Sequence, residues 1–182
     1  MPGVPLNERG RTQATALAER LAALPIKAVY SSPLERATET ARAVAGPHEL
    51  EVVVREALLE TDVGEWQGRS LKELARLKEW KALQRTPSRM RFPGGESVPE
   101  TQFRMCREIE AVCVRHDAKD TIVCVSHGDP IRLAVAHYVG LPLDLFQRLD
   151  VVPASVTAVS LGENGIRLLA LNWQGTLSLP KP

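Results

Sequence analysis

Cysteine, net charge and long apolar runs are all scarce in this sequence. It holds three cysteines among 182 residues, and none of them has the C-x-x-C spacing of a zinc or redox site. An odd count without that spacing also argues against a disulfide framework. We therefore expect Cys106, Cys113 and Cys124 to be small buried hydrophobic residues, and we predict no metal site.

The charge balance excludes further classes of protein. The formal net charge is +1, so no overall field points to a nucleic acid or a membrane surface. No apolar run approaches the roughly 18 residues that a membrane span needs, and the first residues lack the apolar core of a signal peptide. We expect a cytoplasmic protein that forms a single domain over residues 1–182.

Apolar strands alternate with amphipathic helices along the chain. We expect a helix over about residues 8–23 with Asn7 as its N-cap, a strand near residues 28–30, and a helix behind the capping-box pattern Ser32-Pro33-Leu34-Glu35. The other expected elements are a strand over 51–54, helices over about 71–83 and 98–116, a strand over 122–125 with its helix, and a hairpin around Asn164-Gly165. This order predicts an α/β fold, a three-layer α/β/α sandwich with a mainly parallel sheet and an antiparallel edge.

His127 stands where an apolar strand ends and a helix begins. The run from Ile122 to Val125 is typical of a strand buried on both faces, and Asp129-Pro130 suits the start of a helix. Open α/β sheets bind ligands at this edge, and helix N-termini favour anions. A lone histidine is more often structural than catalytic, so this stretch alone leaves both interpretations open.

Arg36 occupies a second junction of the same kind, because it follows the strand that ends at Ser31-Ser32. Two such junctions on a parallel sheet open on the same edge. The planar guanidinium of arginine binds phosphate in bidentate fashion. The alternative is a surface arginine paired with Glu35 or Glu39.

Glu60 closes a short apolar run and precedes a loop that contains Gly64, Trp66 and Gly68. A carboxyl group beside apolar and aromatic side chains has a raised pKa and can act as a general acid. An ordinary loop carboxylate is the alternative. The glycine-rich segment 93–97 before a helix can present N–H groups to an anion, although a plain turn explains it equally well.

Five stretches taken together resemble the histidine phosphatase superfamily, which has the phosphoglycerate mutase-like fold. They are PLNERGRTQATALAERL, VYSSPLERATETA, LLETDVGEWQG, FPGGES and VCVSHG, in family order from Leu6 to about Gly128. The later stretch DLFQRLDVVPASV is similar, more loosely, to an actinobacterial subgroup described as probable phosphomutases.

The resemblance implies phosphoryl transfer through a phosphohistidine, without a metal or other cofactor, on a small phosphorylated metabolite. Arg36 and His127, with Gly128 beside it, would bind the phosphate. Glu60 would protonate the leaving group. Spread positive charge and precise positioning are what a transferring phosphoryl group requires.

The sequence departs from the family at one point, because it contains no Arg-His-Gly triplet. In the family this triplet ends the first strand and supplies the nucleophilic histidine. We therefore expect a chain that is truncated at its N-terminus, lacks the first strand and is inactive as written. A phosphomonoester phosphatase by descent is the leading interpretation, since the chain is short; a phosphomutase and a non-catalytic phosphate-binding or interaction module are the alternatives. Oligomeric state cannot be inferred from the sequence.

Overall fold

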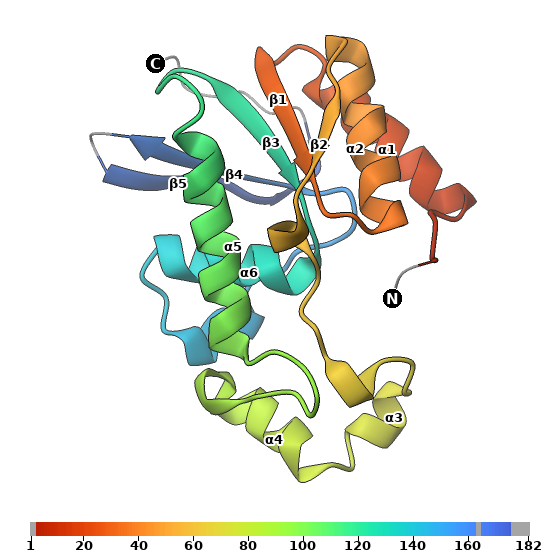
Figure 1. Ribbon diagram of the computed structural model, residues 1–182, viewed down its shortest axis with the longest axis vertical. Helices are drawn as coiled ribbons and strands as arrows, with labels where there is room; N and C mark the ends of the chain where they lie inside the picture. Colours follow the sequence, from red (N-terminus) through yellow and green to blue (C-terminus); the bar gives the residue numbers. More distant parts are fainter. Residues whose placement is uncertain (1–2, 163–164, 176–182) are drawn as a thin grey trace.

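Helices cover both faces of a small parallel sheet in the computed structural model, which describes residues 3–162 and 165–175 (Figure 1). The α-helices are α1 (Glu8–Leu21), α2 (Glu35–Ala45), α3 (Leu71–Leu74), α4 (Lys78–Arg85), α5 (Val98–Cys113) and α6 (Gly128–Tyr138). The strands are β1 (Ile26–Ser31), β2 (Val52–Val54), β3 (Thr121–Val125), β4 (Val156–Gly162) and β5 (Gly165–Trp173).

The sheet topology confirms the predicted fold class. Strands β2, β1 and β3 form a three-stranded sheet in that order, and both pairings are parallel. The antiparallel hairpin of β4 and β5 forms a two-stranded sheet of its own. It was predicted around Asn164-Gly165, of which Asn164 lies outside the described residues.

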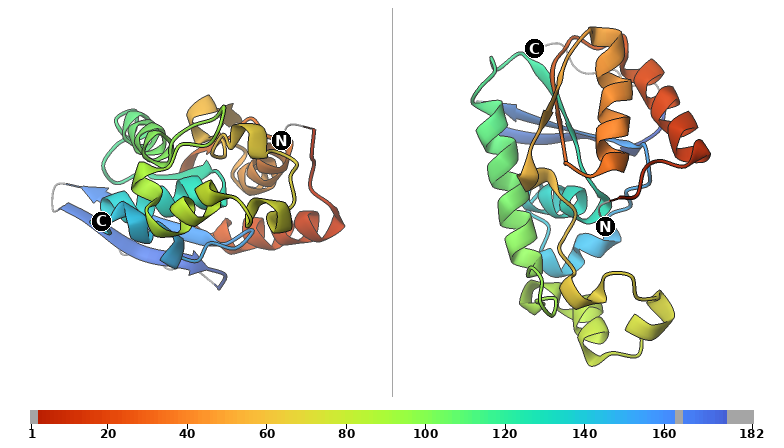
Figure 2. Two further views of the ribbon diagram at one scale, coloured as in Figure 1. Left: turned by 90° about the horizontal axis from the view of Figure 1, so that it is seen from below. Right: turned by 45° about the vertical axis from the view of Figure 1, so that its right-hand side comes forward.

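Helices lie on both sides of β1 and β3, as the right-hand view of Figure 2 shows, and the side chains of these strands alternate between the two helical layers. Val29 and Val123 pack into a core with residues of α1 and α2. Tyr30 and Cys124, one position further along each strand, pack with α5 and α6. A three-layer α/β/α arrangement follows from this alternation, because each face of the sheet buries a separate apolar cluster.

A third apolar cluster supports the segment between β2 and α5. Trp66 lies edge-on to Phe92, with ring centroids 5.2 Å apart, and both side chains are buried. The rest of this cluster comes from α3, α4, α5, α6 and the turns near them: Leu74, Leu83, Met90, Val98, Leu133, Ala136 and Phe146. The loop that follows Glu60 is thereby anchored to the body of the protein.

Three of the predicted helix caps are confirmed. The side chain of Asn7 accepts a hydrogen bond from the Gly10 N–H at 2.8 Å. Ser70 and Ser97 both form complete capping boxes. The helix behind Ser70 is shorter than expected, because α3 ends at Leu74 and α4 begins separately at Lys78.

Two other caps were predicted wrongly, and both lie at the junctions of interest. Helix α2 begins at Glu35, and its N-cap, Leu34, makes no side-chain bond. Ser32 accepts from the Leu34 N–H at 3.4 Å and is bonded instead to His127. Likewise Asp129, expected as the N-cap of the helix that Asp129-Pro130 opens, lies inside α6, which begins at Gly128 with His127 as its N-cap; Asp129 forms an ion pair with Arg132.

Strand β3 is also less buried than its apolar run predicts. Its residues from Ile122 to Val125 are half-buried, where the sequence predicts burial on both faces. Within the part of the chain that the structure describes, β3 is hydrogen-bonded to β1 alone and so forms one edge of its sheet. No helix of the described residues is long and apolar enough to cross a membrane.

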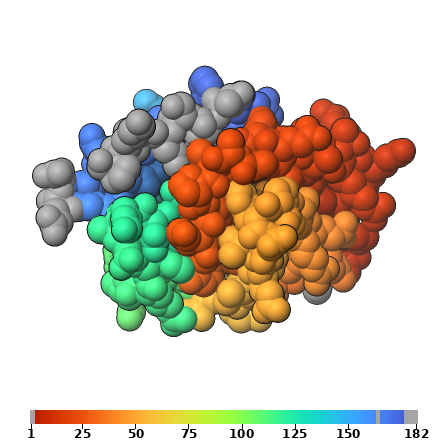
Figure 3. Space-filling model, turned by 90° about the horizontal axis from the view of Figure 1, so that it is seen from above, coloured from red at the N-terminus to blue at the C-terminus, as the bar shows by residue number. Residues whose placement is uncertain are grey.

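The two ends of the parallel sheet differ in what they carry. Figure 3 shows the end at which the strands begin, where the green segment before β3, the orange-red start of β1 and the amber segment before β2 lie side by side. The strands end on the opposite side of the sheet, in the middle of the molecule in Figure 1. Arg36 and His127 follow these C-terminal ends.

Two loops near that end are packed backbone against backbone. The Glu65 N–H donates to the carbonyl of Pro93 at 2.9 Å, and the Glu96 N–H donates to that of Asp62 at 2.9 Å. A Cβ atom at Gly64 would lie 2.2 Å from the Pro93 oxygen, and the residue has φ of +49°. Only glycine both adopts this positive φ easily and has no Cβ atom to clash with Pro93.

We expect Gly64→Ala to destabilise the protein much more than Gly68→Ala. Both glycines have a positive φ, but a Cβ at Gly68 would meet nothing within 4 Å. The control should therefore lose about 1 kcal/mol, the cost of a left-handed alanine, whereas Gly64→Ala should lose about 3 kcal/mol because the clash adds to that cost. Urea denaturation measures both values. Equal losses would show that the two loops do not depend on this close approach.

Candidate active site

The structure brings Arg36 and His127 together from two different junctions. Arg36 lies in the first turn of α2, behind β1, and His127 lies between β3 and α6. The Nη2 atom of Arg36 is 3.4 Å from the Nδ1 atom of His127. The predicted meeting of these two residues at one edge of the sheet is therefore seen in the geometry.

The partners of His127 determine which of its ring nitrogens carries the proton. An arginine side chain can only donate, so Nδ1 must accept from Arg36. The hydrogen then resides on Nε2, which donates to the Ser32 Oγ atom at 2.8 Å. Burial, and then the neighbouring charge of Arg36, lower the pKa of His127 to about 4. At neutral pH the ring is uncharged, in agreement with this hydrogen-bond pattern.

Glu60 lies half-buried in the loop between β2 and α3, within electrostatic reach of Arg36 and Asp129. Burial raises the pKa of Glu60 to about 7, with the charge of Asp129 acting in the same direction. The Thr61 N–H, which donates to the carboxyl at 3.0 Å, and the charge of Arg36 oppose this rise only in part. A carboxyl with this pKa is protonated in about half of the protein molecules at pH 7. The apolar run before Glu60 predicts such a raised pKa.

Gly128 begins α6 next to His127, and a Cβ atom built on it would meet nothing within 4 Å. The amino end of an α-helix carries partial positive charge, so an anion beside Gly128 would be stabilised. The site thus combines a cationic fork, a neutral imidazole, a helix N-terminus and a carboxyl that can donate a proton. This set can bind a phosphate ester and protonate an oxygen that leaves it.

Three residues of this region were not predicted as part of the site. Ser32 binds the His127 ring, Ser126 donates to the Leu58 carbonyl at 2.8 Å, and Arg104 holds the loop that carries Glu60. Only Arg104 leaves a signal in the sequence. It stands on the buried face of α5 with Thr101 and Glu108, where a charged residue requires a partner.

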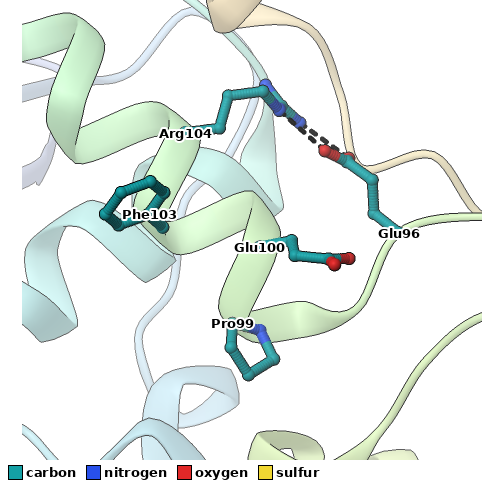
Figure 4. Close-up of a pocket in the computed structure, with 5 residues that line it drawn as sticks. All are labelled: Glu96, Pro99, Glu100, Phe103 and Arg104. Carbon is teal, nitrogen blue, oxygen red and sulfur yellow. Dashed lines mark hydrogen bonds and ion pairs between the residues drawn. The ribbon is translucent and has the colours of Figure 1, made fainter.

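The remaining histidines of the described chain lie in other surroundings. His116 is bonded through Nε2 to the Tyr30 hydroxyl at 2.9 Å, and His137 stacks edge-on with Tyr138. A hollow on α5 is lined by Glu96, Pro99, Glu100, Phe103 and Arg104 (Figure 4). None of the predicted phosphate-binding residues lines it, so we place the candidate site at the Arg36–His127 contact.

Comparison with known proteins agrees with the fold. The family model of the histidine phosphatase superfamily, branch 1, matches residues 1–174. The chain belongs to the histidine phosphatase superfamily. The resemblance inferred from the five sequence stretches is thereby confirmed.

Relatives within the superfamily include both phosphatases and mutases. The chain is 32% identical to phosphoserine phosphatase 1 of Hydrogenobacter thermophilus over 92% of its own length and 80% of that protein's. It is 28% identical to the 2,3-bisphosphoglycerate-dependent phosphoglycerate mutase of Thermoplasma acidophilum over 86% of its length and 74% of that protein's. Among solved structures, Bacillus stearothermophilus YhfR superposes with a TM-score of 0.87 at 26% identity, covering 95% of this chain and 88% of that one.

We expect Glu60→Gln and His127→Gln to change the pH dependence of stability in opposite directions. Glu60 binds its proton more tightly in the folded state, so its contribution is present below pH 4.5 and is lost as the pH rises to about 7. His127 binds its proton less tightly when folded, so its contribution is present above pH 6.5 and is lost as the pH falls to about 4. Each substitution removes one of these dependences.

The measurement is the free energy of unfolding of wild type and both variants in urea between pH 4 and 8. The difference between wild type and Glu60→Gln should shrink by about 2 kcal/mol from pH 4.5 to pH 8. The difference between wild type and His127→Gln should instead grow as the pH rises from 4 to 6.5. Parallel curves for all three proteins would mean that neither group has a shifted pKa.

Proposed function

We propose that this protein is by descent a phosphatase of small phosphate monoesters, and that Arg36, His127 and Glu60 form the phosphate-binding and proton-donating part of its site. The observation that carries this proposal is the contact of Arg36 with a neutral His127 at the ends of two parallel strands. Burying a histidine against an arginine costs free energy. Ordinary surface residues would not be held in this way, so the contact favours a functional role.

In the proposed reaction each residue has a separate task. The guanidinium of Arg36 and the N–H groups at the start of α6 bind the equatorial oxygens of the phosphoryl group. The Nδ1 atom of His127 accepts from Arg36 in the free protein, and it can take up a proton when a phosphate dianion arrives and favours the charged ring. Glu60 would give its proton to the ester oxygen as that oxygen leaves phosphorus and a nucleophile from outside this group of residues bonds to phosphorus in its place.

Hydrolysis is the outcome that we favour over transfer to a second position of the same substrate. The phosphoserine phosphatase of Hydrogenobacter thermophilus supports hydrolysis, and the phosphoglycerate mutase of Thermoplasma acidophilum supports the alternative. The identity to the phosphatase is also higher, 32% against 28% for the mutase. A phosphomutase is thus the second candidate function.

The nucleophile is the remaining requirement of phosphohistidine chemistry. The family's Arg-His-Gly triplet does not occur in the 182 residues. We infer that these residues bind phosphate without turning over an ester. A member of this enzyme family would then act as a phosphate-binding module, which is one of the alternatives that the sequence leaves open.

We expect the purified 182-residue chain to release no phosphate from an aryl phosphate or from phosphoserine above the level of its His127→Ala variant. The same assay with 3-phosphoglycerate, followed by nuclear magnetic resonance, would detect isomerisation. Turnover that disappears in His127→Ala would contradict the inferred lack of a nucleophile. Phosphate release would then support the phosphatase, and isomerisation without release the mutase.

Binding of inorganic phosphate tests the site independently of turnover. We expect Arg36→Ala to weaken binding about tenfold or more at pH 6.5, because the charge-assisted bonds of its guanidinium are lost. Arg42→Ala is the matched control, since Arg42 lies in the last turn of the same helix. Titration calorimetry measures both affinities. Equal affinities for the two variants would argue against a phosphate site at Arg36.

A further inference from the structure

The chain segment that leads to the carboxyl of Glu60 is held by side chains and not by a sheet. Residues 57–60 lie outside the described strands. The carbonyl of Leu58 accepts from the Ser126 hydroxyl at 2.8 Å. The carbonyls of Ala57 and Leu59, on either side of it, both accept from one side chain, that of Arg104.

Arg104 uses two edges of its guanidinium group. On one edge, Nη1 donates to the Ala57 carbonyl at 2.7 Å and the Leu59 carbonyl at 3.0 Å, and Nη2 approaches the Glu60 carbonyl at 3.5 Å. On the other, Nε and Nη2 each lie 2.8 Å from one carboxylate oxygen of Glu96 (Figure 4). A single planar group thus joins helix α5, the loop of Glu60 and the glycine-rich loop.

Glu96 extends this connection to the far side of the Glu60 loop. Its carboxylate accepts from the Asp62 N–H at 3.0 Å, and its own N–H donates to the Asp62 carbonyl at 2.9 Å. Although burial acts to raise the pKa of Glu96, the bonds from Arg104 and from the Asp62 N–H hold that pKa below its ordinary value. The carboxylate is ionised at neutral pH, so the ion pair with Arg104 is maintained where the site works.

We propose that Arg104, paired with Glu96, is a positioning residue that holds the backbone of residues 57–62 so that Glu60 stays half-buried within electrostatic reach of Arg36. The proposal rests on the role of Glu60 proposed above. Lysine cannot replace this arginine, because its single ammonium group cannot bind two carbonyls on one edge and a carboxylate on another.

A simpler role for Arg104 leads to a different expectation. As a mere neighbouring charge, the guanidinium acts to lower the pKa of Glu60. Removing that charge without moving the loop would raise the pKa. Releasing the loop would instead expose Glu60 to water and lower the pKa toward 4.5, so the direction of the change distinguishes the two roles.

The test is a titration of the Glu60 carboxyl by ¹³C nuclear magnetic resonance in the full chain, with the signal assigned by Glu60→Gln. We expect a midpoint near pH 7 in wild type. It should fall by about one unit or more in both Arg104→Lys and Arg104→Met. Arg107→Met is the matched control, because this exposed arginine of the same helix lies over the Phe103 ring and should leave the midpoint unchanged.

A second pair of variants decides the question if the Arg104 variants do not fold. Glu96→Gln keeps the size of the side chain but weakens its hold on Arg104. Glu100→Gln is its control, because it removes a carboxylate in the first turn of α5 that is paired with Arg91 instead. We expect the Glu60 midpoint to fall by about half a unit or more in Glu96→Gln and to stay in place in Glu100→Gln.

Two results would overturn the proposal. A raised midpoint in Arg104→Met with an unchanged one in Arg104→Lys would show that Arg104 acts only as a charge. An unchanged midpoint in Glu96→Gln would show that the ion pair does not hold the loop. Because no substrate is present in this titration, it succeeds or fails independently of phosphate binding and turnover.

Discussion

The parallel pairing of β1 with β3 is the constraint on which the candidate site depends. Ser31 pairs with Val125, and the Ser32 N–H continues the ladder by donating to the Val125 carbonyl at 2.9 Å. Both strands therefore end at the same level of the sheet. The chain turns into α2 after one strand and into α6 after the other, and these two turns place Arg36 against His127. A shift in register between the strands would separate them.

Glu60 reaches the same place by another route. No strand ends beside it, and its loop is held by a guanidinium, a hydroxyl and the close contact of two loops at Gly64 and Gly95. Such polar contacts are strong only when every partner is present, because an unpaired buried charge or carbonyl is costly. The position of Glu60 should therefore be more sensitive to distant substitutions than the contact between Arg36 and His127.

Burial shifts the charge state of two residues of the site. It lowers the pKa of His127 and raises that of Glu60, so both groups favour their uncharged forms. Arg36 stays charged, and the N-terminus of α6 adds partial positive charge. Burial therefore reduces the negative charge beside Arg36, which favours a phosphate dianion there.

The sequence by itself determined the fold class and the family, and it named Arg36, Glu60 and His127 as candidates for the site. These conclusions depend on local patterns, namely apolar periodicity, capping residues and short motifs such as SSPLER and VSHG. The capping boxes at Ser70 and Ser97 were predicted for the same reason, since a cap involves residues only three positions apart.

Only the tertiary structure decided what Ser32, Arg104 and Glu96 do. Ser32 had the pattern of a cap, but a histidine 95 residues away is its partner, and the ion pair of Arg104 with Glu96 acts on a loop more than 40 residues away. Strand β3 likewise has the composition of a central strand, and the number of its neighbours made it an edge. Local sequence cannot specify such partners, because hydrogen bonds and burial between distant segments exist only once the sheet and its helices have assembled.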